Sequence, residues 1–95
     1  MHVISRKKLK EAAAQHGNLE VALDVWFRVA KKADWKSLQE VRQIFPSADQ
    51  VEGYTVFNIK GNACRLITRI LYRYGRVYVR HVLTHAEYDK GDWKK

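Results

Sequence analysis

The second half of the sequence alternates apolar and polar residues with a period of two, and this constrains the fold more than any other feature. The alternation runs through YTVFNI, ACRLITRILY and RVYVRHVL, which cover residues 54–59, 63–72 and 76–83. Short loops containing Gly61 and Gly75 separate these runs. Such alternation is typical of strands with one buried face, and short glycine-containing loops favour hairpins. We therefore expect three consecutive strands in an antiparallel sheet.

The first half of the sequence has helical spacing instead. Ser5 can cap a helix that ends near Gly17, and Asn18 can cap a second helix. Ser37 and Glu40 have the spacing of a capping box at the start of a third, shorter helix. The second helix has a broad apolar stripe, which indicates that it covers a sheet. The stripe contains Ala22, Val25, Trp26, Val29 and Ala33, widened by Leu23, Phe27 and Ala30.

Together these elements predict one α+β domain spanning residues 1–95. A short apolar segment at Val3 and Ile4 precedes the helices, so the expected order is β-α-α-(α)-β-β-β. The helices are expected to pack on one face of a mainly antiparallel sheet. The chain has 95 residues, 46% of them hydrophobic, which is enough for one modest core.

The loop around Gly75 sets the pairing expected between the last two strands. Turns of two or four residues centred on Tyr74 and Gly75 give the same pairing, in which Arg69 faces Arg80. The face expected under the helices carries Leu66, Thr68, Ile70 and Tyr72 opposite Leu83, His81, Val79 and Val77. The other face, called here the arginine face, carries Arg65, Ile67, Arg69 and Leu71, expected opposite Thr84, Val82, Arg80 and Tyr78.

Positive charge is concentrated in these strands. The chain has 18 Lys and Arg against 10 Asp and Glu, a net charge of +8. Between Gly53 and Ala86 there is no acidic residue, and the basic ones are Lys60, Arg65, Arg69, Arg73, Arg76 and Arg80. Opposed like charges destabilise a sheet unless an anion lies between them, so facing arginines predict a phosphate site. The alternative is that these arginines are simply solvated strand residues.

Several classes of protein are disfavoured by what the sequence lacks. A single cysteine, Cys64, excludes an internal disulfide and a cysteine-rich metal site, so we expect a reducing cytoplasm. No apolar run approaches about 20 residues, so neither a membrane span nor a signal peptide is expected. The sequence has no phosphate-binding GxxxxGK[ST] loop, HExxH or GxSxG motif. We expect no metal and no other cofactor.

Five stretches of the sequence carry a family resemblance. They are MHVISRKKL, AKKADWKSLQEV, FPSA, VFNIKGNACRLITRILY and VYVRHVLTHAEYDK, which together extend to Lys90. In these the chain resembles the HigB toxins of bacterial type II toxin–antitoxin modules, a branch of the RelE-like mRNA interferases. The resemblance implies an endoribonuclease that cuts mRNA during translation in the ribosomal A site. It also implies a HigA-type antitoxin whose helix-turn-helix binds operator DNA.

The resemblance implies roles for the basic strand residues in metal-independent cleavage. In that reaction the ribose 2′-hydroxyl attacks the adjacent phosphate, so the enzyme must position the backbone, move protons and stabilise negative charge. Lys60 would be the base or a charge stabiliser. Arg65 or Arg69 would hold the phosphate, and Arg80 would stabilise the transition state.

The THAEYD motif supplies the remaining candidates. Tyr88 would stack on a base or relay a proton, although its ring could instead close the edge of the sheet. His85 would be the general acid or base, because imidazole changes its charge near neutral pH. His81, on the face expected under the helices, is interpreted as a structural histidine.

Two other functions fit the same sequence. A non-catalytic protein that binds RNA or the ribosome would also be basic, with tyrosines such as Tyr72, Tyr74 and Tyr78 stacking on bases. Only product formation separates it from an enzyme, since both classes bind phosphates electrostatically. A DNA-binding regulator is less well supported, because the sequence has no helix-turn-helix pattern.

Overall fold

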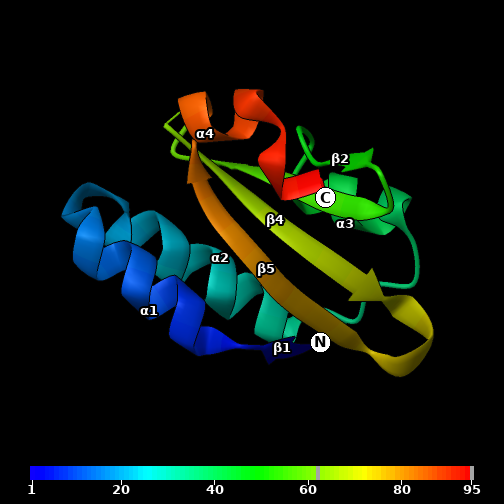
Figure 1. Cartoon of the computed structure of the whole chain (residues 1–95). Coiled ribbons are helices and arrows are strands. Elements are labelled where there is room, and N and C mark those ends of the chain that lie inside the picture. The colour runs from blue at the N-terminus through cyan, green and yellow to red at the C-terminus, as the bar shows by residue number, and fades with distance from the viewer. Residues whose placement is uncertain (62, 95) are drawn as a thin grey trace.

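The computed structural model of the chain describes residues 1–61 and 63–94, so Asn62 of the FNIKGN motif lies outside the described residues. Figure 1 shows helices packed against a twisted sheet. The helices are α1 (Arg6–Gln15), α2 (Glu20–Lys32), α3 (Leu38–Ile44) and α4 (His85–Lys90), and the strands are β1 (His2–Ile4), β2 (Asp49–Val51), β3 (Tyr54–Ile59), β4 (Cys64–Leu71) and β5 (Arg76–Thr84). The predicted α+β class is confirmed.

The strands form one sheet in the order β1-β5-β4-β3-β2. β1 runs parallel to β5, and the other neighbours are antiparallel. The three strands predicted in the second half correspond to β3, β4 and β5. Sequence periodicity did not reveal β2, which joins β3 through a two-residue turn at Glu52 and Gly53, with φ of 53° and 82°. Paired positive φ values are typical of the tight turns that connect hairpin strands.

Two of the three helix caps predicted from the sequence are confirmed. Ser5 caps α1 by accepting a hydrogen bond from the backbone N–H of Lys7 at 3.2 Å. Ser37 caps α3 by accepting one from the N–H of Glu40 at 3.4 Å. The prediction for Asn18 was wrong, because a 3₁₀ turn over Gly17–Leu19 precedes α2 and no side chain caps that helix.

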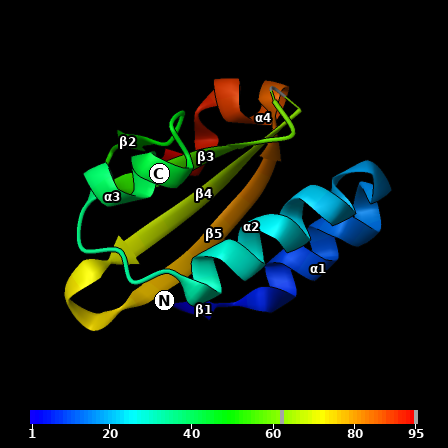
Figure 2. The same cartoon turned by 180° about the vertical axis from the view of Figure 1, so that it is seen from behind.

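The main core lies between the sheet and the first three helices, which Figure 2 shows in front of the strands. Phe57 of β3 is at its centre, with its ring centroid 5.3 Å from Trp26, 6.3 Å from Trp35 and 5.3 Å from Phe45. Leu66 of β4, the strand partner of Phe57, is fully buried in the same core. The aromatic residues therefore join α2 and α3 to the middle of the sheet.

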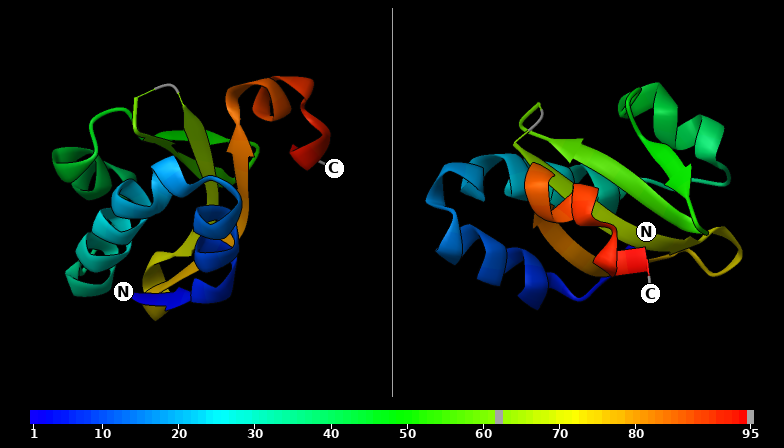
Figure 3. Two further views of the ribbon diagram at one scale, coloured as in Figure 1. Left: turned by 90° about the vertical axis from the view of Figure 1, so that its left-hand side faces the viewer. Right: turned by 45° about the horizontal axis from the view of Figure 1, so that its top comes forward.

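A second, smaller cluster lies on the arginine face. Val56 and Ile67 pack there against Trp93, which belongs to a 3₁₀ turn at Asp92–Lys94. The side view in Figure 3 shows α4 and the C-terminal turn on the opposite side of the sheet from α2 and α3. The helices predicted from sequence thus pack on one face, and the C-terminal segment covers part of the other.

The β4–β5 hairpin begins one residue earlier than we expected. Leu71 pairs with Arg76, so the loop is Tyr72–Gly75, with Gly75 at a φ of 65°. Arg69 consequently faces Tyr78. The predicted pairing of Arg69 with Arg80 was wrong.

A β-bulge then changes which residues of β5 reach each face. Ile67 pairs with His81 and Thr68 with Val79, so Arg80 is the extra residue between them. Beyond the bulge, Val82 packs with the main core and Leu83 with the smaller cluster. The expected placement of His81 and Leu83 under the helices was therefore wrong, whereas Val79 is buried there as predicted. A bulge inserts one residue, which inverts the inside–outside alternation that follows it.

Two apolar residues of α2 allow the packing to be tested on a single helix. Leu23 is 2% exposed and Val21 is 76% exposed. We expect Leu23→Ala to lower the free energy of unfolding by about 2–5 kcal/mol, because it leaves a cavity. Val21→Ala is expected to change it by less than about 0.5 kcal/mol. Urea denaturation of the two variants measures both effects, and equal losses would contradict this orientation of α2.

Candidate active site

Four of the six expected site residues lie at one end of the sheet. Lys60 follows β3, Arg65 is near the start of β4, and α4 contributes His85 and Tyr88. Arg65 pairs with Leu83, so it lies beside the end of β5, just before α4 begins. The end of β3, the start of β4 and the start of α4 therefore lie at the same end of the sheet, at the top of Figure 1.

A capping box starts α4 directly after β5. The N–H of Thr84 donates to Glu87 Oε1 at 2.9 Å, and the N–H of Glu87 donates to Thr84 Oγ1 at 3.2 Å. The hydrogen bond from the Thr84 N–H, with a smaller contribution from its hydroxyl, lowers the pKa of Glu87. This helix was not predicted from the sequence, although the T-x-x-E spacing that signals it is present in THAEYD.

Tyr88 connects the C-terminal segment to Arg65. The Arg65 guanidinium carbon lies 5.6 Å from the Tyr88 ring centroid. Trp93 stacks on the same tyrosine, with centroids 5.1 Å apart and an interplanar angle of 16°, and donates a hydrogen bond from Nε1 to the Tyr88 carbonyl at 2.9 Å. The Tyr88 ring is thus fixed by one aromatic and one cationic neighbour. No sequence motif had drawn attention to Trp93.

Lys60 lies on the helical side of this end of the sheet. Its backbone has a φ of 53°, and its Nζ donates to the carbonyl of Asn18 at 3.1 Å. The bond links the β3–β4 loop to the turn before α2. Lys60 is exposed, so the ammonium group can exchange this carbonyl for a phosphate at little cost.

His85 has an acidic neighbour on the outer surface of α4. Its Nε2 lies 3.5 Å from Asp89 Oδ2, and their side chains are 56% and 61% exposed. A carboxylate at this distance orients an imidazole, although such exposed pairs contribute little to stability.

Arg69 and Arg80 do not join this group. Arg69 lies four residues beyond Arg65 on β4, about 13 Å along the strand. Arg80 is exposed at the bulge, where its carbonyl accepts a 3.0 Å hydrogen bond from Lys8 Nζ. Beside it, burial lowers the pKa of His81, and the positive charges of Lys8 and Arg80 add to the effect. His81 therefore stays neutral near pH 7 on the arginine face.

Cys64 lies next to Arg65 but is protected from reaction. Its side chain is 1% exposed, and burial raises the pKa of its thiol to about 11, although the Arg65 guanidinium opposes the shift. The thiolate is the nucleophilic form of cysteine, so a buried neutral thiol is a packing residue here.

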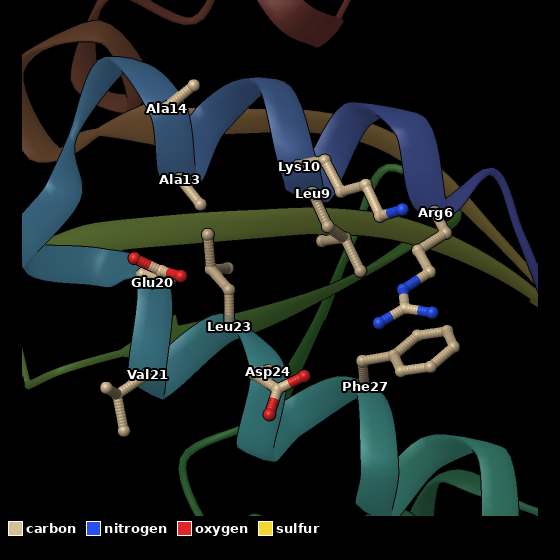
Figure 4. A pocket seen from close by; sticks show the side chains of 10 residues that line it. All are labelled: Arg6, Leu9, Lys10, Ala13, Ala14, Glu20, Val21, Leu23, Asp24 and Phe27. Carbon is tan, nitrogen blue, oxygen red and sulfur yellow. The ribbon is translucent and has the colours of Figure 1, made fainter.

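A cleft of about 460 Å³ lies elsewhere, between α1 and α2 (Figure 4). Arg6 covers Phe27 in this cleft, with 4.4 Å between the guanidinium carbon and the ring centroid. None of the expected site residues lines it, so we assign the candidate active site to the end of the sheet.

Within residues 1–61 and 63–94, no group of three or more His, Cys, Asp or Glu side chains is placed to hold a metal ion. No helix in the same ranges is both long and apolar enough to cross a membrane.

A basic α+β domain with helices behind an antiparallel sheet and arginines on its other face has the architecture of RelE-like proteins. The family described as "RelE-like toxic component of a toxin-antitoxin system" matches residues 19–91. The mRNA interferase HigB of Escherichia coli O6:H1 is 36% identical over 93 residues, covering 95% of this chain and 90% of its own. The mRNA interferase toxin HigB of Escherichia coli K12 is 32% identical over 92 residues, covering 94% and 88%. The chain belongs to the HigB toxin family.

The buried thiol predicts a specific dependence of stability on pH. The unfolded chain loses the Cys64 proton at a lower pH than the folded chain, whose thiol pKa is about 11. Stability present below the unfolded pKa of about 9 is therefore lost as the pH rises towards 11, by about 2 kcal/mol. The measurement is the free energy of unfolding against pH for the wild type and Cys64→Ala, whose difference removes the titration of other groups. Parallel profiles would contradict a buried, protonated thiol.

Proposed function

We propose that this protein is an mRNA interferase, the toxin of a type II toxin–antitoxin pair. Its family membership and the names of its relatives support an endoribonuclease acting on mRNA. The observation that carries the proposal for the site is the Arg65 guanidinium held over the Tyr88 ring. That contact positions a group suited to binding phosphate, at the end of the sheet where β3 ends and α4 begins.

The proposed reaction uses the 2′-hydroxyl of the RNA as the nucleophile. Its oxygen attacks the adjacent phosphorus while the bond to the 5′-oxygen breaks, giving a 2′,3′-cyclic phosphate and a 5′-hydroxyl end. A general base accepts the hydroxyl proton, and a general acid donates a second proton to the leaving 5′-oxygen. Arg65 binds the non-bridging oxygens and stabilises their added negative charge.

The other candidates are assigned by what each side chain can do. His85, beside Asp89, transfers a proton. Lys60 supplies positive charge near the phosphate when it leaves the Asn18 carbonyl. The Tyr88 ring contacts both Trp93 and Arg65. These contacts favour a role for Tyr88 in positioning the Arg65 guanidinium over a role in stacking on a base. Arg80 lies at the bulge, three residues before Leu83, the strand partner of Arg65, and its assigned role is to add positive charge from outside the Arg65 group.

The proposal extends to the partners. The net charge of +8 suits contact with ribosomal RNA, and we expect cleavage in the ribosomal A site in the cytoplasm. A HigA-type antitoxin is expected to neutralise the toxin, either by covering the arginine face or by preventing entry into the ribosome. Contact with operator DNA would then be made by the antitoxin.

A non-catalytic RNA-binding protein is the second candidate function. The arginine–tyrosine contacts on the sheet would serve it equally well. The experiment is to induce the chain alone and with its co-expressed antitoxin, and to map mRNA 5′ ends by primer extension. New cleavage sites that vanish with the antitoxin support the interferase, and growth arrest without cleavage supports the binding protein.

Arg65 provides the first mutational test. We expect Arg65→Ala to reduce cleavage by about 100-fold or more, the usual effect of removing a group that stabilises transition-state charge. The matched control is Lys31→Ala, which removes a charge from the exposed end of α2 and should cleave like the wild type. Thermal unfolding followed by circular dichroism checks that both variants fold. Full activity of Arg65→Ala would rule out its assigned role.

Arg80 is tested separately because it lies outside the Arg65 group. Arg80→Ala is expected to abolish growth arrest and leave the fold intact, since the residue is exposed and its hydrogen bond to Lys8 uses the backbone carbonyl. Growth is followed after induction, with protein amounts matched by immunoblot. Arrest at wild-type expression levels would show that Arg80 is dispensable.

A further inference from the structure

The far end of β4 from the candidate active site carries a second group of arginines and tyrosines. Each arginine contacts a tyrosine. The pairs are Arg69 with Tyr54 (guanidinium carbon to ring centroid 5.3 Å), Arg73 with Tyr74 (5.9 Å) and Arg76 with Tyr78 (Nη1 to the hydroxyl oxygen, 3.4 Å). We call these six residues the hairpin surface, because four of them belong to the β4–β5 hairpin loop and the strand that follows it.

Strand register brings the members of the hairpin surface together. Arg69 pairs with Tyr78, and Arg76 is two residues from Tyr78 on the same strand. Residues two apart on a strand share a face, so these three side chains project from the same side of the sheet. Arg73 and Tyr74 extend the group into the loop.

Arg69 is exposed, and its guanidinium is positioned by an aromatic ring. Its guanidinium lies over Tyr54 and against the β2–β3 turn, where a Cβ built on Gly53 would be 3.6 Å from Arg69 Nη2. A guanidinium that is already positioned loses little conformational entropy when it binds a phosphate.

The hairpin surface is cationic and has an exposed ring. In the described part of the chain, no ion pair links Arg69, Arg73 or Arg76 to a carboxylate. Tyr74 is 64% exposed, which is unusual for so large an apolar ring. Cations beside exposed aromatic rings are the features by which proteins bind single-stranded nucleic acids, with phosphates on the cations and bases on the rings.

The hairpin surface is physically separate from the candidate active site. Figure 1 shows the hairpin loop and α4 at opposite ends of β4. Trp93 lies between them on the arginine face. Its ring centroid is 5.1 Å from that of Tyr88, in the candidate active site, and 5.8 Å from that of Tyr54, in the hairpin surface. Trp93 is 5% exposed, so it separates the two groups without offering a ring to a base.

We infer that the hairpin surface is a second RNA-binding site, which holds unpaired nucleotides flanking the position of cleavage. The inference rests on the proposed function for the identity of the RNA as a substrate. Unpaired RNA is favoured over a duplex because only an unpaired base can stack on Tyr74. A separate site of this kind raises the affinity for RNA without taking part in the chemical step.

The test measures binding without cleavage. The probe is a fluorescein-labelled 12-nucleotide oligouridylate with 2′-O-methyl riboses, which lacks the attacking hydroxyl, and fluorescence anisotropy gives its Kd. The double variant Arg73→Gln/Arg76→Gln removes two charges from the hairpin surface. Lys31→Gln/Lys32→Gln removes two charges from the exposed end of α2 and is the matched control. Tyr74→Leu removes the ring and keeps the charge.

The expected results differ for the three variants. The arginine double variant should weaken binding about tenfold or more and lower the slope of log K against log salt concentration by about 1.4, the value for two phosphate contacts on a single strand. Tyr74→Leu should weaken binding about fivefold or more and leave the slope unchanged. The lysine double variant should bind within about twofold of the wild type.

Three results would overturn the inference. The first is no binding by the wild type, and the second is an equal loss in the two double variants, which would mean diffuse electrostatic attraction. The third is unchanged binding by Tyr74→Leu together with equal affinity for the probe annealed to oligoadenylate, which would mean a surface that reads phosphates alone.

Failure of the inference can be distinguished from failure of the proposed function. If the wild type cleaves mRNA but the arginine double variant binds and cleaves like it, the hairpin surface has no such role and the interferase stands. If the probe binds as expected but the wild type cleaves no mRNA, the hairpin surface stands as an RNA-binding site only, and the enzyme proposal fails.

Discussion

The packing of Trp93 on Val56 and Ile67 is the contact on which the candidate active site depends. It folds the last turns of the chain across the arginine face, and the stacking of Trp93 on Tyr88 then sets where that tyrosine meets Arg65. Truncating a buried tryptophan of this kind costs about 3–5 kcal/mol. The same packing of Trp93 therefore holds the C-terminal segment on the sheet and positions the Arg65 guanidinium.

The two faces of the sheet have different roles, one in packing against the helices and one in presenting cationic side chains. On β4, Leu66 and Thr68 point into the core under the helices, and Thr68 Oγ1 satisfies its hydrogen bond by donating to the Thr55 carbonyl at 2.8 Å. Arg65 and Arg69 point to the other side. Because adjacent residues face opposite ways, the helices can be packed tightly without restricting the cationic side chains.

The sequence was sufficient to predict the three long strands, because their period of two is set by burial of one face. It did not reveal the β-bulge at Arg80, because two consecutive polar residues, Arg80 and His81, interrupt the alternation only briefly and do not show which of them is left without a partner on β4. Register depends on contacts between strands, and the turn that fixes it began one residue earlier than the position of Gly75 indicated.

The sequence also indicated the basic residues of the candidate site, but not how they are grouped. The basic residues of β4 and β5 stand out because no acidic residue interrupts them, but their division into two groups depends on distance along the strands and on Trp93. Trp93 lies near the end of the chain, after the segment that carries the family resemblance, and a lone tryptophan has no periodic pattern to indicate its neighbours. Only the folding of the chain back onto the sheet brings it to Tyr88.

The distribution of the tryptophans gives the protein a natural spectroscopic label. Trp26 and Trp35 belong to the core under the helices, whereas Trp93 belongs to the cluster on the arginine face and has Lys94 Nζ 5.6 Å from its ring. Indole emission is sensitive to nearby charge and to stacking. A chain with phenylalanine at the two core positions would therefore emit from a single indole, whose signal reports directly on ligands that approach the cationic face.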